Sequence, residues 1–374
     1  VAFPAAIKTK YETYLKEFDN KRGHVPFSPD LDANRHKITM FMKSKFEAAG
    51  LHVSLQNFSS MDTSTGKPAN GTNVIAILRG TTYSTPQDEA IIIAAHIDTF
   101  GRDAGGVNND GSGLVGLLAI AEDLTGPANC TRNKTVVFAA FDRSETENIG
   151  PSLTYCNKSC GSIHFIKNIA SFISSGKIKL AMVLDCLANF DDKISTQYWP
   201  PVLGKYFRNT VEENTMVDAY GDFLAVTGRN NEKSYIEEFA KIYDASKVEG
   251  AFQITKLQWN IQGIPNAGNR SNLIAAFKDG DHISFWDSNI NAILLTDTCY
   301  NRDWMRGNCK TTSSCDTIGK IDDKGYSFMY NALYAATKLI TKNTCTGKQG
   351  GKGSYFTSIT REVVAQSPEP GAHV

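Results

Sequence analysis

Short apolar runs alternate with segments of helical periodicity along most of this chain. Six runs are continuously apolar, which indicates strands covered on both faces; they are residues 73–78, 90–98, 135–142, 180–186, 222–228 and 291–297. Five helical candidates accompany them, at residues 31–49, 113–124, 163–175, 233–245 and 325–341. This alternation predicts an α/β fold with three layers, α/β/α, around a mostly parallel central sheet.

The chain shows no internal repeat, linker or second core, so we expect one large domain. Its 374 residues are enough to bury a sizeable core. We place this domain at residues 1–346, with a helical N-terminal part at 1–50 and a Gly-, Ser- and Pro-rich tail at 347–374. We interpret Val1 as a processed N-terminus, because the sequence does not begin with methionine.

Charge and hydropathy narrow the class of partner. The 39 basic residues balance 39 acidic ones, which argues against nucleic acid or an anionic membrane as the main partner. No apolar run approaches the roughly 18 residues of a transmembrane helix. We therefore predict an unknown small molecule, peptide or protein as partner, with no nucleic acid and no transmembrane segment.

The cysteines favour an oxidising compartment. Their number is even and they lack the CxxC spacing of a zinc ribbon, which suits disulfides; the alternative is a set of buried free thiols in a cytosolic protein. Residues 156–160 could close one small loop and residues 309–315 another, although the sequence does not fix the pairing. The eight are Cys130, Cys156, Cys160, Cys186, Cys299, Cys309, Cys315 and Cys345.

Asn-x-Ser/Thr sequons tip the balance toward a secreted, extracellular glycoprotein. A single sequon is a weak signal, but several of these flank cysteines or lie in segments typical of loops, where N-glycans are attached. The predicted glycosylation sites are Asn57, Asn70, Asn129, Asn133, Asn157 and Asn269.

Polar clusters lie at the carboxyl ends of three of the predicted strands. They are "HID" at 96–98, "FDRSETE" at 141–147 and "LDC" at 184–186. Each alone has an ordinary explanation as a capped turn or a solvated acidic run. In a sheet of this kind, however, the ligand site lies beyond the carboxyl ends of the strands. Together the clusters predict a functional site at that edge.

The order of the motifs resembles the secreted zinc-dependent aminopeptidase family, whose relatives include glutamate carboxypeptidase, glutaminyl cyclase and the transferrin receptor ectodomain. The motifs are AAHxD, G-x-N-x-x-G-S-G opening a helix, "FAAFD", "VLD", "GDFLAVTG", "DHISFWD", "AILLTDT" and "CDTIGKID". The resemblance runs from about residue 30 to 340 and implies an α/β/α domain with a pocket at the strand ends. The resemblance also implies the site of the active members, in which two zinc ions share a bridging Asp and polarise the scissile carbonyl.

Half of the first zinc site matches the family. His96 corresponds to the first His ligand, Asp98 to the acid that orients it, and Asp185 to the Asp ligand of the same ion. The bridging position holds Asn109, a neutral amide. We read these positions as remnants of a metal site.

The second site departs further from the family pattern. Active relatives read aromatic-x-x-Glu-Glu after the strand, whereas this chain reads "FDRSE". Ser144 therefore takes the position of the general base and Glu145 that of a ligand. The segment 299–317, where the second His ligand is expected, contains no histidine.

These changes predict that no functional zinc site forms. Two divalent ions about 4 Å apart repel by on the order of 16 kcal/mol at an effective dielectric of 20, and Asn109 carries no charge to offset this. Ser144 cannot act as a base near neutral pH, which removes a factor of roughly 10² to 10⁴ in rate. We expect no catalytic residues and no cofactor.

The leading hypothesis is therefore a catalytically inactive relative, a pseudoenzyme that binds a ligand or has a structural role. The alternative is an active metal-dependent aminopeptidase or cyclase with a variant zinc site. It would need Asp110 as bridge, Glu145 with Glu147 as base and ligand, and His282 as the missing ligand. Asp281 and His282 are otherwise pocket-wall residues at a helix start, and the neighbouring aromatics line the pocket or belong to the core: Phe285, Trp286 and Tyr300.

Overall fold

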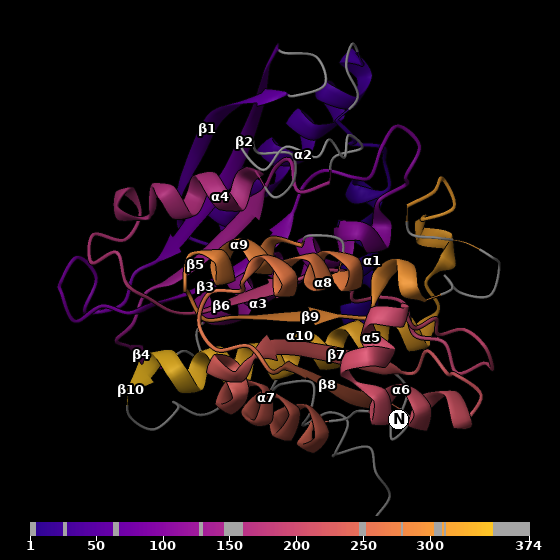
Figure 1. The fold of residues 1–374 in the computed structure, drawn as a ribbon. Helices are drawn as coiled ribbons and strands as arrows, with labels where there is room; N and C mark the ends of the chain where they lie inside the picture. Colours follow the sequence, from indigo (N-terminus) through magenta and orange to yellow (C-terminus); the bar gives the residue numbers. More distant parts are fainter. Residues whose placement is uncertain are drawn as a thin grey trace, which may run out of the picture.

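The fold is organised around an eight-stranded sheet (Figure 1). The computed structural model describes residues 5–24, 28–62, 67–126, 130–145, 160–246, 252–277, 280–302, 309 and 312–346, so the predicted tail lies outside the described residues. The strand order is β1-β2-β5-β3-β6-β9-β7-β8. The strands are β1 (His52–Asp62), β2 (Lys67–Leu78), β3 (Ala90–His96), β5 (Val136–Phe141), β6 (Ile178–Leu184), β7 (Phe223–Arg229), β8 (Gln253–Trp259) and β9 (Ala292–Thr296).

The centre of the sheet is parallel, as predicted. The pairs β3·β5, β3·β6, β6·β9 and β7·β8 are parallel, whereas β1·β2, β2·β5 and β7·β9 are antiparallel. Each of the six apolar runs forms a strand. The sequence patterns missed β1 and β8, which lie at the two edges. Edge strands keep exposed polar side chains and therefore do not read as continuous apolar runs.

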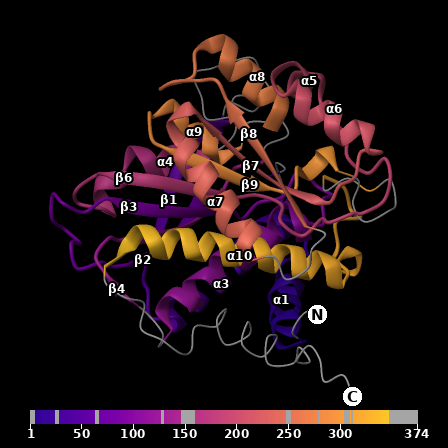
Figure 2. The ribbon, with the colours of Figure 1, turned by 90° about the horizontal axis from the view of Figure 1, so that it is seen from below.

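Helices cover both faces of the sheet, which confirms the α/β/α architecture. Alternate strand residues point to opposite sides: Ile91 and Ile93 join the core under one helical layer, and Ile92 and Ala94 join the other. In Figure 2, α3 and α10 lie below the strands and α8 and α5 above them. The first layer contains α1 (Ala5–Phe18), α2 (Pro29–Ala48), α3 (Gly113–Thr125), α7 (Lys233–Ala245) and α10 (Asp323–Thr344).

The second layer is built from shorter helices, and most of these were not predicted. They are α4 (Cys160–Lys167), α5 (Pro201–Tyr206), α6 (Arg208–Met216), α8 (Ala267–Phe277) and α9 (Asp281–Asp287). The expected helix at 163–175 ends early, at Lys167, and a 3₁₀ turn follows at Ile169–Ser171. In α6 no residue is fully buried, and in α9 residues 281–286 all are. Neither helix therefore carries a one-sided apolar stripe by which it could be recognised.

The prediction of disulfides is confirmed. Three are described, Cys130–Cys345, Cys186–Cys299 and Cys309–Cys315, and the last closes the small loop expected from the spacing. Cys160 is also disulfide-bonded, whereas Cys156 lies outside the described residues. Disulfides of this kind are typical of proteins in oxidising compartments, so they are consistent with an extracellular protein.

The predicted glycosylation sites differ in exposure. Asn57 and Asn70 are exposed on the β1–β2 hairpin, and Asn133 and Asn269 are half-buried. Asn129 and Asn157 lie outside the described residues. Glycosylation stays a prediction. In the part of the chain that the structure describes, the helices are all too short or too polar to cross a membrane.

Candidate functional site

Buried carboxylates hold the loop between β3 and α3 beneath the site. Asp110 accepts hydrogen bonds from the backbone N–H groups of His96 (3.0 Å), Gly113 (3.0 Å) and Cys186 (3.2 Å). Its carboxylate thereby joins three segments and caps the start of α3. The Asn109–Asp110 peptide bond is cis. The three hydrogen bonds of its carboxylate show that Asp110 supports the loop from within.

Two more acids fix the same loop from neighbouring segments. Asp316 accepts from the backbone N–H groups of Asn108 (2.8 Å) and Asn109 (3.0 Å). Asp297, which follows β9, accepts from the Asn108 side chain at 3.0 Å and from the backbone of Asn189 and Cys299 at 2.8 Å. The Asn109 side chain is therefore held by a rigid backbone. Burial raises the pKa of Asp316 to about 7, although the backbone hydrogen bonds oppose this.

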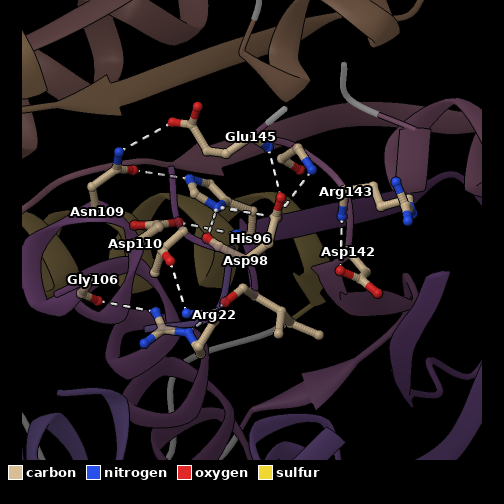
Figure 3. Close-up of polar contacts among 12 residues, drawn as sticks. Arg22, His96, Asp98, Gly106, Asn109, Asp110, Asp142, Arg143 and Glu145 are labelled. Atoms are coloured by element: carbon tan, nitrogen blue, oxygen red, sulfur yellow. Dashed lines mark hydrogen bonds and ion pairs between the residues drawn. The ribbon is translucent and has the colours of Figure 1, made fainter. Parts of the chain in front are cut away.

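A buried arginine fastens the N-terminal segment to this loop. Arg22 is 0% exposed, and its guanidinium donates to the backbone oxygens of Ile97 (2.6 Å), Gly106 (3.0 Å) and Phe18 (Figure 3). Burial lowers its pKa to about 10, and the surrounding carboxylates, including Asp316, oppose that shift. The arginine stays charged at neutral pH and partly balances the buried acids.

Asn109 connects the two halves of the predicted metal site. Its Oδ1 lies 3.1 Å from His96 Nε2, and its Nδ2 donates to Glu145 Oε1 at 3.1 Å (Figure 3). His96 Nδ1 lies 2.8 Å from the backbone oxygen of Asp98. The chain of contacts therefore runs from Asp98 through the imidazole and the amide to the Glu145 carboxylate, all of it buried.

This chain of hydrogen bonds determines where the protons are. A carboxylate only accepts, so the amide nitrogen of Asn109 faces Glu145 and the amide oxygen faces the imidazole. Nε2 must then carry a proton, and Nδ1 must carry one because it faces a carbonyl oxygen. His96 is thus an imidazolium that donates from both nitrogens. Burial lowers its pKa, but the hydrogen bond to Asp98 and the charges of Asp110 and Asp185 raise it further, to well above its usual value.

The residue at the general-base position is part of a second network. Asp98 accepts the backbone N–H groups of Ser144 (3.0 Å) and Glu145 (2.8 Å), which fixes the turn after β5. The Ser144 hydroxyl donates to Asp281 Oδ2 at 2.7 Å. Burial raises the pKa of Asp281 to about 6, and the positive charge of His96 opposes that shift.

Asp185 lies at the end of β6 and faces the same space. Its Oδ1 is 3.9 Å from His96 Nε2, and its side chain is 16% exposed. Burial raises its pKa to about 7, His96 opposes this, and the nearby Glu145 and Asp281 add to it. Donor atoms of His96, Asp110 and Asp185 lie within 4.8 Å of one another. They form one of three groups of possible metal-ligand atoms among the described residues; the others are His24, Asp98 and Asp142, and Asp185, Cys186 and Cys299.

A pocket opens beside Asp185, with mixed polar and apolar walls. Its lining comprises Asp185, Ala276, Phe277, Leu294, Thr296, Thr298, Cys299, Tyr300 and Asn301. Tyr300 is thus a wall residue, as one interpretation of the sequence suggested. Phe285 and Trp286 are 0% exposed and belong to the core, which favours the other interpretation for these two.

His282 lies in an aromatic enclosure. Its ring meets Phe277 and Trp286 edge to face, with centroids 5.5 and 4.8 Å away. Neither ring nitrogen has a hydrogen-bond partner among the described residues, and burial lowers the pKa of His282 to about 3. The imidazole is therefore neutral. Glu147, the other residue predicted for a variant site, lies outside the described residues.

Sequence reasoning missed three residues that hold the loop beneath the site: Arg22, Asp297 and Asp316. The two acids carried a usable signal, because Asp297 is the last residue of a predicted strand and Asp316 lies in one of the quoted motifs. Arg22 carried none. It comes from a polar segment after α1, and a lone arginine in such a segment is usually exposed.

Comparison with known proteins agrees with this geometry. Residues 73–229 match the model of Peptidase family M28. The chain is 21% identical over 318 residues to the uncharacterized protein YfbL of Escherichia coli K12, covering 82% of this chain and 83% of that protein. At 318 residues, this likeness is longer than the stretch matched by the family model.

Solved structures share the fold. Macrostomum lignano glutaminyl cyclase superposes with a TM-score of 0.59 at 15% identity, covering 90% of each chain. The Legionella pneumophila LapA aminopeptidase superposes with a TM-score of 0.54 at 14% identity, covering 92% of this chain and 75% of that one. These findings support the resemblance stated from the motifs: residues 73–229 match Peptidase family M28, and the fold is similar to those of a solved aminopeptidase and a solved glutaminyl cyclase.

Proposed function

We propose that this protein is a non-catalytic relative of the family, in which hydrogen bonds among His96, Asn109 and Glu145 replace the metal ions. The observation that carries the proposal is the carboxamide of Asn109, at 3.1 Å from each of the other two side chains. An amide can satisfy an imidazolium on one side and a carboxylate on the other without any cation between them. The positive charge that zinc would supply is supplied by the ring of His96.

The donor atoms do not fit the zinc centre that the family implies. A catalytic zinc takes three protein ligands that are free to coordinate. Asp110 uses its carboxylate on three backbone N–H groups, and both nitrogens of His96 carry protons and donate. The carboxylates that remain able to coordinate an ion are those of Asp185 and Glu145. In Glu145, Oε1 already accepts a hydrogen bond from Asn109, which leaves Oε2 for the ion. Two carboxylates of this kind make a weak site.

The proposal also covers the chemistry. Ser144 stands where the active family has its base, and its hydroxyl donates to Asp281. A neutral hydroxyl is too weak a base to take a proton from water at neutral pH, whatever its hydrogen-bond partner. We therefore expect a binding or structural role without turnover, in a protein that is secreted and glycosylated.

A second candidate is an active enzyme with a single metal ion. It is favoured by the close spacing of His96, Asp110 and Asp185 and by the solved neighbours, which include aminopeptidases and glutaminyl cyclases. It would require Asp110 to release its backbone partners and His96 to lose a proton. No group of three donor residues within 4.8 Å includes His282 in the described part of the chain, which counts against that residue as the missing ligand.

The test combines metal content with turnover. The purified chain is dialysed against zinc and then against buffer, its metal is measured by elemental mass spectrometry, and the same sample is assayed with aminoacyl chromogens and with N-terminal glutaminyl peptides. We expect zinc well below one equivalent and no turnover that a chelator abolishes. Stoichiometric zinc with chelator-sensitive turnover of either substrate overturns the proposal and selects the second candidate.

A further inference from the structure

The disulfide between Cys186 and Cys299 lies against the carboxylate of Asp185, at the rim of the candidate site. We propose that reduction of this disulfide creates a thiolate zinc site formed by Asp185, Cys186 and Cys299. The site differs from the two-zinc arrangement of the family, because it shares Asp185 with the family's ligand positions but takes both of its sulfur ligands from outside them. The inference rests on the proposed function in one respect, that the oxidised chain holds no zinc of its own.

The contacts of Asp185 already have the geometry of metal ligands. Its Oδ1 lies 3.4 Å from Cys186 Sγ and 3.3 Å from Cys299 Sγ. Disulfide sulfurs carry no hydrogen, so these contacts are not hydrogen bonds in the oxidised protein. With bonds of about 2.3 Å to sulfur and about 2.1 Å to oxygen, a tetrahedral zinc separates such ligands by about 3.6 Å. The oxygen therefore needs almost no movement to join two thiolates on one ion.

The two sulfurs are placed so that side-chain rotation can separate them. Tetrahedral zinc requires thiolates about 3.8 Å apart, and the Cα atoms of Cys186 and Cys299 are 5.4 Å apart, a spacing that both a disulfide and a shared ion can span. Each cysteine follows the end of a strand, β6 and β9, which pair directly in the sheet. The strands can therefore stay in place while the sulfur ligands open.

The backbone at these cysteines is unusual. Cys186 and Cys299 have φ values of 59° and 50°, and the preceding Thr298 has a φ of 79°. This left-handed region is disfavoured for residues with a Cβ. Such conformations persist where the surroundings demand them and concentrate at functional sites. Here they aim both sulfurs at the same carboxylate oxygen.

The pocket gives an ion a way in and an open coordination position. Asp185 and Cys299 both belong to its lining. Three protein ligands leave the fourth tetrahedral position to water or to a ligand in the pocket. Sulfur and oxygen donors together favour zinc over the hard cations magnesium and calcium. Among the described cysteines, this pair is the one that shares a group of donor atoms with a carboxylate.

The reaction is a thiol–disulfide exchange followed by metal binding. A dithiol reductant attacks one sulfur, the S–S bond breaks, and the reductant leaves as a disulfide after transferring two electrons and two protons. Each resulting thiol then loses one proton as its sulfur binds zinc. With the Asp185 carboxylate, the three ligands carry three negative charges against two on the ion.

Cobalt(II) in place of zinc makes the site visible. The full chain is titrated with cobalt before and after reduction by a phosphine under anaerobic conditions. We expect a thiolate-to-cobalt charge-transfer band and the visible bands of tetrahedral cobalt in the reduced chain alone. The band should vanish in C186S/C299S and persist in the matched variant C130S/C345S, which removes a disulfide at the short strand pair β4 (Thr131–Arg132) and β10 (Cys345–Thr346). D185N should weaken cobalt binding more than about 100-fold, beyond the loss typical of an outer-shell partner.

A second readout does not depend on the variants. The chain is refolded under reducing conditions with zinc and treated with an alkylating reagent, and the modified cysteines are mapped by mass spectrometry. Protection of Cys186 and Cys299 that a chelator removes supports the site, whereas equal modification with and without zinc overturns it. Cobalt or zinc taken up by the oxidised chain without a thiolate band would overturn the proposed function instead. The band after reduction still decides the thiolate site.

Discussion

Two groups of buried acids meet at the same strand ends and are used in different ways. Asp98, Asp110 and Asp316 bind backbone N–H groups, three of them in the case of Asp110. We call these the loop-holding acids. Glu145, Asp185 and Asp281 instead point their carboxylates into the site, toward side chains. We call these the site-facing acids.

The difference separates what the fold needs from what the chemistry needs. A backbone N–H in a buried loop must have an acceptor whether or not a metal is present, so the loop-holding acids are required in any protein with these loops. The site-facing acids have partners that depend on neighbouring side chains. The departures from the family pattern, Asn109 and Ser144, both contact this second group. The proposed loss of catalysis therefore leaves the scaffold intact.

The largest effect is expected from removing a loop-holding acid. Asp110→Ala leaves three buried backbone N–H groups without an acceptor, at about 1–3 kcal/mol each. We expect a loss of about 3–9 kcal/mol in the free energy of unfolding, measured by urea denaturation. Glu145→Ala is the matched control from the site-facing group and should cost less than half as much. Equal losses for the two variants would remove the distinction between the groups.

A change at His282 tests the histidine that adjoins the site-facing group. Burial holds its pKa at about 3 in the folded chain, against about 6.5 in the unfolded chain. The unfolded state therefore takes up a proton first, and stability is lost as pH falls from about 6.5 toward 3. His282→Phe removes this titrating group, and its ring fits between Phe277 and Trp286. When the pH falls from 7 to 4, the free energy of unfolding of the wild type should fall by about 3 kcal/mol more than that of the variant.

Thermal unfolding of the two proteins across this pH range provides the measurement. Parallel curves would mean that His282 has the same pKa folded and unfolded. In that case the ring has a partner in solution that the described residues do not provide.

Asp281 should show the opposite pH dependence, with a smaller effect. Burial raises its folded pKa to about 6, above the unfolded value of about 3.9. The folded state binds this proton more tightly, so the stabilisation is fully present below about pH 4 and is lost as pH rises through 6. Asp281→Asn keeps an acceptor for Ser144 and removes the titration. When the pH is raised from 4 to 7, the free energy of unfolding of the variant should rise by about 2 kcal/mol relative to that of the wild type.

Differential scanning calorimetry at pH 4, 5, 6 and 7 tests this prediction. Ser144→Ala, which leaves the carboxyl in place but removes its hydrogen bond, should keep or enlarge the pH dependence. A wild type and an Asp281→Asn variant with the same pH profile would contradict the predicted shift.

The sequence predicted the fold better than it predicted the site. Central strands are buried on both faces, and this produced six apolar runs that each proved to be a strand. The edge strands β1 and β8 and the short helices lack that signature. At the site, chain position was enough to bring His96, Asn109, Glu145 and Asp185 together, because all follow or adjoin strand ends.

What the sequence could not supply is the direction of each side chain. The position of Asp110 next to Asn109 made it a possible substitute bridge, yet its carboxylate is turned toward backbone N–H groups. Likewise His282 looked available as a ligand, but its ring is enclosed by Phe277 and Trp286. The direction of a side chain depends on rotation about its own bonds, and a pattern of residue types carries no information about that rotation.

The smallest effect is expected from replacing one amide nitrogen by a carboxylate oxygen at the centre of the site. This change also tests most directly the difference between loop-holding and site-facing acids. Asn109→Asp places a carboxylate between His96 and Glu145 without changing the backbone that Asp316 holds. We expect zinc affinity to rise by about 10–100-fold, or roughly 1.4–2.8 kcal/mol, by isothermal titration. Asn109→Leu, of similar size, breaks the same hydrogen bonds without adding charge and should gain nothing. If both variants gained equally, the amide would merely block a site that is otherwise complete; if neither did, the missing ligands would matter more than the bridge.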